Sequence, residues 1–242
     1  MVLGQSAVDA KTNEITAIPE LLSLLDIESS IITLDAMGCQ KKIAEQIIKQ
    51  KADYILALKG NHSGMQAELE AWWHKTQREG LSEQNYAEHT EIDSGHRRIE
   101  TRTYQQMLVD KRWLGKDYRW SGLKSIIKIS STVHHKSTGQ DTSETRWYIA
   151  SLDLNAEQSL HAVRSHWQVE SMHWVFDMTF REDESRIRKG CGALAFSVMR
   201  KIAMALFKQD STKSASIAAK KKMAGLDDNY RSTLLESGIK MR

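Results

Sequence analysis

Two short apolar segments separated by one amphipathic segment constrain the fold of this chain more than any other feature. Residues 31–34 and residues 54–58 are runs of β-branched and aliphatic side chains, the composition of buried strands. Between them, the apolar side chains of residues 43–48 recur at the spacing of one helical face. A strand, a helix and a strand at this spacing predict a pair of parallel strands.

Polar residues follow both of these predicted strands. Asp35 comes directly after the first strand, and the segment of residues 59–62 (KGNH) comes directly after the second. Ligands of open parallel sheets gather at the carboxyl ends of the strands. We therefore expect functional side chains at this edge of the sheet.

The rest of the chain adds further strands and a helical end. The alternating pattern of residues 86–104 turns at residues 93–95 (DSG), which predicts a β-hairpin. The other expected elements are a strand at residues 1–10, a helix opened by Pro19 and extending to Leu25, strands at residues 123–131 and 146–151, a helix at residues 191–208 and shorter helices beyond it. The pattern predicts a mixed α/β protein in three regions: residues 1–80, a β-rich insertion at residues 81–152 and a helical region at residues 153–242.

A predicted helix at residues 156–178 carries a row of ionisable side chains. Asn155 and Gln158 form the capping-box pattern that starts it. Leucine, valine and tryptophan side chains form an apolar stripe along the helix, which lets it dock on a core. The opposite face carries two imidazoles and two carboxylates at the i, i+4, i+7 and i+11 spacing: His166, Glu170, His173 and Asp177.

Asp35 and Glu170 together indicate a metal site. Taken alone, an aspartate after a strand is most often a turn former or a helix cap. Two-metal phosphoryl transfer needs carboxylates that bind cations about 4 Å apart, and Mg²⁺ prefers a few carboxylates. A strand-end acid and an acid on a helix packed across the same sheet meet this need, with a third acid normally required. Glu170 and His173 also form the Glu-x-x-His spacing of di-iron helical bundles, but a bundle needs a second copy, which the chain lacks.

Composition excludes several classes of protein. No segment approaches the roughly 18 consecutive apolar residues of a membrane span, and the amino terminus has no secretory signal pattern. We therefore expect a cytoplasmic protein without membrane contacts. Cys39 and Cys191 lack the spacing of a zinc site or a disulfide framework, so both are expected to be buried free thiols.

Positive charge is concentrated in the last quarter of the chain. Residues 181–242 contain 14 Lys and Arg against 7 Asp and Glu, although the whole chain has a net charge of only +3. Such a segment is either a surface for a polyanion or a solvated helical face. Its first basic residues alternate with acids, so they could hold phosphates or form an ion-pair network. The Trp72-Trp73 pair could stack on an unpaired base, although core packing is the favoured assignment.

Five segments distributed along the chain form a specific set: residues 18–22 (IPELL), 34–41 (LDAMGCQK), 58–61 (LKGN), 96–102 (HRRIETR) and 166–183 (HWQVESMHWVFDMTFRED). Together they resemble the insertion-sequence transposases with an Asp-Asp-Glu site, in the ISAs-type branch that includes the H-repeat-associated proteins. The resemblance implies a ribonuclease-H-like mixed sheet with flanking helices and a β-rich insertion before the last catalytic acid. It also implies Mg²⁺ or Mn²⁺ as cofactor and DNA cleavage with strand transfer as activity.

The resemblance also assigns roles to the two acids. Asp35 corresponds to the second acid of the family and Glu170 to the third, as catalytic residues and metal ligands. The first acid lies in an Asp-Gly-Lys segment on an earlier strand, which this sequence does not contain; Asp9 falls after the strand in question and does not replace it. Ser171 and Arg97 also depart from the family pattern. We therefore expect a copy truncated at its amino terminus and catalytically incomplete.

The expected partners are DNA, as element ends and target, and a second copy of the chain in a homodimer. The alternative function is that of a DNA-binding remnant of a transposase that performs no chemistry. The candidate DNA contacts are Lys59, Asn61, His62, Arg97, Arg98, Arg164, His166, Arg181, Arg186, Arg188 and Lys189.

Overall fold

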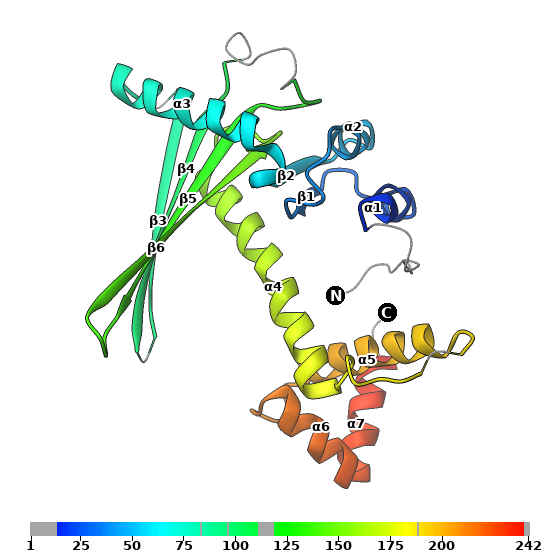
Figure 1. Cartoon of the computed structure of the whole chain (residues 1–242). Coiled ribbons are helices and arrows are strands. Elements are labelled where there is room, and N and C mark those ends of the chain that lie inside the picture. The colour runs from blue at the N-terminus through cyan, green and yellow to red at the C-terminus, as the bar shows by residue number, and fades with distance from the viewer. Residues whose placement is uncertain (1–13, 83, 96, 111–118, 188, 240–242) are drawn as a thin grey trace. The chain divides into compact units, whose positions relative to one another are not determined.

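The sheet and its helices occupy the first two thirds of the chain, and a group of helices follows (Figure 1). The structure is a computed structural model that describes residues 14–82, 84–95, 97–110, 119–187 and 189–239. The chain divides into two compact units between His166 and Trp167. We call the described residues up to His166 the sheet unit and those from Trp167 the helical unit.

The sheet unit contains six strands in the order β1-β2-β6-β5-β4-β3. β1 and β2 are parallel, and every other neighbouring pair is antiparallel. This confirms the predicted mixed α/β class, the parallel pair and the presence of the first hairpin. The elements are α1 (Glu14–Ser23), β1 (Ile31–Leu34), α2 (Lys41–Lys49), β2 (Asp53–Leu58), η1 (Gly60–His62), α3 (Ser63–Glu79), β3 (Tyr86–Ser94), β4 (Arg98–Leu108), β5 (Ser125–His135), β6 (Gln140–Ala150) and the start of α4 (Ala156–Phe180).

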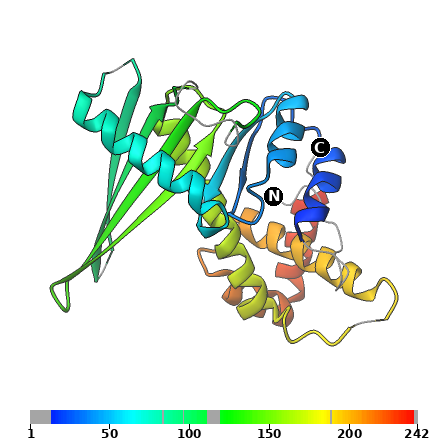
Figure 2. The ribbon, with the colours of Figure 1, turned by 45° about the horizontal axis from the view of Figure 1, so that its top comes forward.

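One face of the sheet packs against α1, α2 and α3. Residues paired across neighbouring strands point to the same face, so Leu56, Ile149 and Ile126 form one row. All three are fully buried in a core that also contains Ile47 of α2 and Trp73 of α3. Figures 1 and 2 show α3 crossing the antiparallel strands near one end, while the turns of the two hairpins project at the other. Alternating apolar residues on the strands and an apolar stripe on each helix account for this layer.

The other face of the sheet is covered by the first turns of α4. Leu160 and Val163 of α4 are buried, as are Ile127 and Ile55 on the facing strands. Thr33 of β1 shares this face with Ile55, its Cα partner in β2. The start of α4 thus lies on the side of the sheet opposite α2 and α3.

Three details of the fold differ from the sequence expectation. Pro19 does not open α1, since the helix begins at Glu14; Ile15 and Ile18 pack on the core, and this contact favours the extra turn although Pro19 lacks an N–H. The strand expected at residues 146–151 begins at Gln140, because its polar half pairs with β5. The first hairpin turns later than residues 93–95, because Asp93 and Ser94 still pair with β4. The strand expected at residues 1–10 lies outside the described residues.

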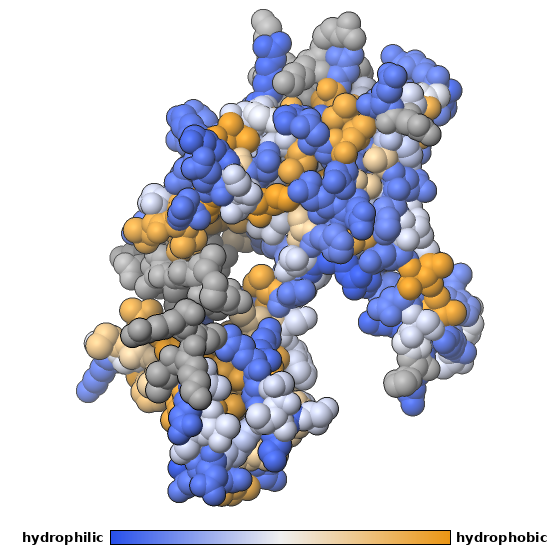
Figure 3. Space-filling model, turned by 180° about the vertical axis from the view of Figure 1, so that it is seen from behind, coloured by the Kyte–Doolittle hydropathy of each residue, from blue (hydrophilic) through white to orange (hydrophobic). Residues whose placement is uncertain are grey.

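The helical unit contains the rest of α4 and three further helices: α5 (Gly192–Gln209), α6 (Ile217–Leu226) and α7 (Asp228–Ile239). Its core contains Phe207, Ala224, Tyr230 and Leu234. The helix expected at residues 191–208 is confirmed. Seen from behind in Figure 3, the molecular surface is largely polar with separate apolar patches. None of the described helices is both long and apolar enough to cross a membrane.

Candidate active site and DNA-binding surface

Asp35 lies at the carboxyl end of β1, as the sequence predicted. Its Oδ1 accepts a hydrogen bond from the backbone N–H of Gly38 at 3.1 Å, so the residue also shapes the turn after the strand. A Cβ on Gly38 would lie 2.9 Å from the Cβ of Leu34, which explains why this turn needs glycine. The Asp35 side chain is exposed, so its carboxylate combines a turn-forming contact with access to a ligand.

Glu170 lies on α4, and its side chain is exposed. The helix starts where the capping pattern predicted, because the N–H of Gln158 donates to Oδ1 of Asn155 at 2.9 Å. One helical turn before Glu170, Nδ1 of His166 lies 3.2 Å from Oγ1 of Thr33 on β1. His166 therefore ties α4 to the strand that ends in Asp35. Asp35 belongs to the sheet unit and Glu170 to the helical unit, and the approach of their carboxylates stays a prediction.

Gln106 anchors the beginning of α4, a role that the sequence pattern did not reveal. Its side chain is fully buried. Nε2 donates to Oγ of Ser125 and to the carbonyl oxygen of Asp153, both at 2.9 Å. Oε1 accepts from the N–H of Asn155 at 2.8 Å and from Oγ of Ser159 at 3.3 Å. One amide group thus fixes the helix start to β4 and β5.

Replacing the Gln106 amide tests how much it contributes to stability. Gln106→Leu is expected to lower the free energy of unfolding by about 1–3 kcal/mol, because buried donors and acceptors lose their partners. Urea denaturation followed by circular dichroism measures the effect. Gln105→Leu is the matched control, because its Nε2 donates to Tyr86 and Glu88 on the opposite face of the sheet. Equal losses for the two variants would contradict the assignment.

The segment after β2 has an internal structural role. Nε2 of His62 lies 2.7 Å from the carbonyl oxygen of Cys39, and its ring meets the ring of Trp120 edge-on at 5.5 Å. Burial raises the pKa of the Cys39 thiol to about 12, which keeps it protonated and unreactive. Cys191 is exposed, so the expectation of a buried thiol is wrong for that residue. Lys59, by contrast, is exposed. The side chain of Asn61 lies outside what the structure describes.

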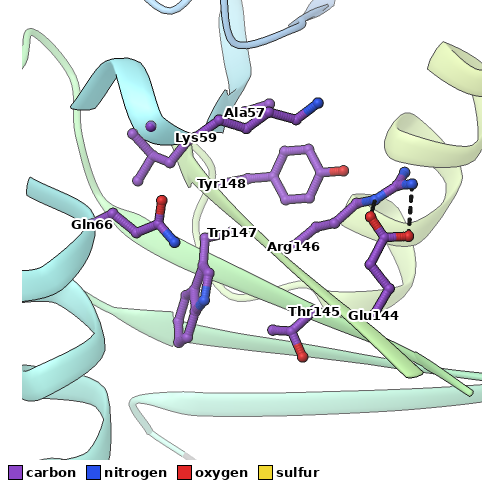
Figure 4. Close-up of a pocket in the computed structure, with 10 residues that line it drawn as sticks. Ala57, Lys59, Gln66, Glu144, Thr145, Arg146, Trp147 and Tyr148 are labelled. Atoms are coloured by element: carbon purple, nitrogen blue, oxygen red, sulfur yellow. Dashed lines mark hydrogen bonds and ion pairs between the residues drawn. The ribbon is translucent and has the colours of Figure 1, made fainter. Parts of the chain in front are cut away.

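A notch of about 320 Å³ opens beside Lys59 where β2 ends (Figure 4). Its walls come from the end of β2, from Gln66 on α3 and from residues 144–148 of β6. The guanidinium of Arg146 donates twice to Glu144, from Nε at 2.7 Å and from its terminal nitrogen at 2.8 Å. Burial is the main cause that raises the pKa of Tyr148 to about 12. No sequence signal had pointed to this arrangement.

The other candidate DNA contacts that the structure describes are exposed side chains, and two of them form ion pairs. Arg97 and Arg98 lie exposed at the turn between β3 and β4. Arg164 forms an ion pair with Glu91, and Arg181 forms one with Glu184 at 3.7 Å. Arg186 and Lys189 are exposed, and Arg188 lies outside the described residues. Contact of these residues with DNA stays a prediction.

Trp72 and Trp73 belong to the core, which confirms the favoured assignment. Trp73 is fully buried, and its ring meets that of Trp147 at 5.3 Å. Neither indole is therefore available as a stacking platform.

Within the described residues, His, Cys, Asp and Glu side chains form no group of three or more that could hold a metal ion.

Comparison with known proteins identifies the family. A family model described as the transposase DDE domain matches residues 1–206. The protein YbfL of Escherichia coli is 38% identical over 241 residues, which cover 97% of this chain and 62% of YbfL. The H repeat-associated putative transposase YhhI of the same organism has the same identity and coverage. The chain thus spans about three fifths of the length of these two relatives. Because the model matches most of its residues, the chain belongs to the transposase DDE domain family.

Proposed function

We propose that this chain is the catalytic part of a DNA transposase, which hydrolyses phosphodiester bonds and transfers the cut strand to target DNA. The observation that carries the proposal is the position of Asp35 at the end of β1, with His166 of α4 in contact with the same strand. Glu170 follows His166 by one helical turn. We therefore propose that both carboxylates serve one site.

Divalent metal ions are the general cofactors of DDE transposases, and we propose Mg²⁺ or Mn²⁺ here. The donor set fits such ions, since both carboxylates are exposed and hard cations prefer carboxylate oxygens. When bound, the metal pair stabilises the charge that develops on attacking and leaving oxygens. Asp35 and Glu170 would bind the ions, and the Asp35–Gly38 hydrogen bond would hold the first carboxylate in orientation.

A second candidate is a DNA-binding remnant that performs no chemistry. It is favoured by the excess of basic side chains in residues 181–242, because an electrostatic DNA surface needs no catalytic acid. A cleavage assay with Mg²⁺ or Mn²⁺ on the DNA ends of the element separates the two functions, when it uses a polypeptide with the Asp-Gly-Lys segment of a relative joined before residue 1. Cleavage that depends on Asp35 and Glu170 supports the catalytic function, whereas binding without cleavage supports the remnant.

DNA binding by either candidate is expected to be mainly electrostatic. The net charge of residues 181–242 is +7, since they contain 14 basic and 7 acidic side chains. Each phosphate contact releases counterions and contributes about −0.9 to the slope of log K against log salt. Fluorescence anisotropy with a random duplex at several salt concentrations measures this slope. Affinity that does not change with salt would argue against a basic DNA surface.

A further inference from the structure

The notch lies at an interruption in the sheet. β2 ends at Leu58, paired with Trp147, whereas β6 continues back to Gln140. Residues 144–146 of β6 therefore extend past the end of β2 and form one wall of the notch, with Lys59 and Gly60 on the other side. The sheet thus provides a recess with basic groups at the carboxyl end of its parallel strands.

The notch is next to Asp35. Leu34 of β1 is paired with Leu56 of β2, and Asp35 and Ala57 are the next residues along the two segments. Ala57 and its partner Tyr148 both line the notch. Neighbouring strands are about 4.8 Å apart, so the notch begins one strand away from the proposed catalytic carboxylate.

Arg146 holds a carboxylate in the geometry that guanidinium groups use for phosphate. Figure 4 shows the two contacts that join its planar group to both oxygens of Glu144. A phosphate presents a similar pair of oxygens to the same fork. The arginine hydrogen bonds are the largest cause of the lowered pKa of Glu144, and Lys59 also contributes through its charge. Two cationic side chains therefore act on one acidic group.

The Arg146–Glu144 ion pair is exposed enough for another anion to replace Glu144. The side chain of Glu144 is 60% exposed and that of Arg146 is 32% exposed. Ion pairs with this much solvent contact contribute little to stability, so replacing Glu144 by another anion costs little. A DNA phosphate offers the same two-oxygen edge and would gain Lys59 as a second cationic contact.

We propose that the notch holds a backbone phosphate of the DNA next to the catalytic site, with Arg146 as its bidentate partner and Lys59 as its second cation. Glu144 occupies the guanidinium fork in the free protein and is displaced when DNA binds. This inference rests on the proposed function, because it takes DNA as the substrate. It adds two residues, Arg146 and Glu144, that the sequence did not indicate.

Charge-matched substitutions test the proposal. Arg146→Met is expected to weaken binding of a labelled random duplex two- to fivefold and to reduce the magnitude of the salt slope by about 0.9. Glu144→Gln is expected to tighten binding by a similar factor, because the competing carboxylate is removed. The Lys51–Glu28 ion pair is a suitable control: it is exposed, joined at 2.9 Å, and lies before β1 and β2 at the amino end of the parallel strands. Lys51→Met and Glu28→Gln change the net charge equally.

The outcomes separate this inference from the proposed function. Opposite effects of Arg146→Met and Glu144→Gln, each larger than in its control, support the phosphate site. If the notch variants behave like their controls while the unchanged chain binds DNA, the inference is wrong and the proposed function stands. If the unchanged chain binds no DNA even at low salt, both are wrong. Circular dichroism of each variant confirms that the fold is retained.

Discussion

Asp35→Ala and Glu170→Ala are each expected to abolish metal-dependent DNA cleavage in a polypeptide that carries all three acids of the family. Losing one carboxylate removes several kcal/mol of transition-state stabilisation, which corresponds to a fall in rate of about 10³-fold or more. The polypeptide for this assay has the Asp-Gly-Lys segment of a relative joined before residue 1. A gel assay on element-end DNA with Mg²⁺ and with Mn²⁺ measures the rate.

The 242-residue chain alone is the informative comparison in that assay. With Asp35 and Glu170 as its two acids of the triad, it is expected to give no detectable cleavage, because Mg²⁺ requires nearly complete octahedral coordination. Glu157→Ala removes an exposed carboxylate at the start of α4 and serves as the control for charge and helix position. Specific cleavage by the 242-residue chain that Asp35→Ala abolishes would show that another residue completes the site.

Asp210→Ala is expected to destabilise the helical unit by about 3–5 kcal/mol, because it breaks a buried ion pair. Asp210 lies 3.3 Å from Nζ of Lys220, and the two side chains are 3% and 7% exposed. Lys220 also donates to the carbonyl oxygen of Phe207, and Tyr230 donates to Asp210. The network joins α5, α6 and α7. Urea denaturation measures the loss, and Asp228→Ala, which breaks an exposed pair with Arg231, is the control with an effect under about 1 kcal/mol.

The same network predicts how stability depends on pH. Desolvation alone would raise the pKa of Asp210, but hydrogen bonds from Thr212, Tyr230 and Lys220 outweigh it and hold the pKa well below its ordinary value of 3.8. The stability that Asp210 contributes is therefore complete above that value and is lost as the pH falls further. Burial and the Asp210 hydrogen bond raise the pKa of Tyr230 to about 12, so its contribution is lost above about pH 10. Asp210→Ala should remove the acid-side dependence; an unchanged profile would contradict this account.

Local patterns were sufficient to predict most of the elements. The apolar runs of β1 and β2, the stripe of α2 and the capping residues of α4 each act within a few residues, so spacing alone identifies them. Pairing between distant segments is different. The alternating pattern of β6 identifies a strand but does not specify β2 as its neighbour, although this pair makes one sheet out of two predicted regions.

For the candidate site, local patterns likewise predict residues but not their contacts. Asp35 is predicted because it follows a strand, and Glu170 because it shares a helical face with His166. The contact of His166 with Thr33 joins residues 133 positions apart, and the contacts of Gln106 reach about 50 positions along the chain. Such contacts depend on how strands and helix pack, and glutamine or threonine gives no chemical signal in a sequence. The Arg146–Glu144 pair is local, but its position in a notch depends on where β2 ends.

The geometry of helix α4 also sets the angle between His166 and Glu170 around the helix axis. His166 is held against β1, and Glu170 comes four residues later on the same unbroken helix. Each residue turns an α-helix by about 100° and advances it by about 1.5 Å. One residue inserted between these two would therefore swing the carboxylate roughly a quarter-turn around the helix axis while leaving the anchor in place. The four-residue spacing between His166 and Glu170 is thus a requirement of the proposed site, which a one-residue insertion would test.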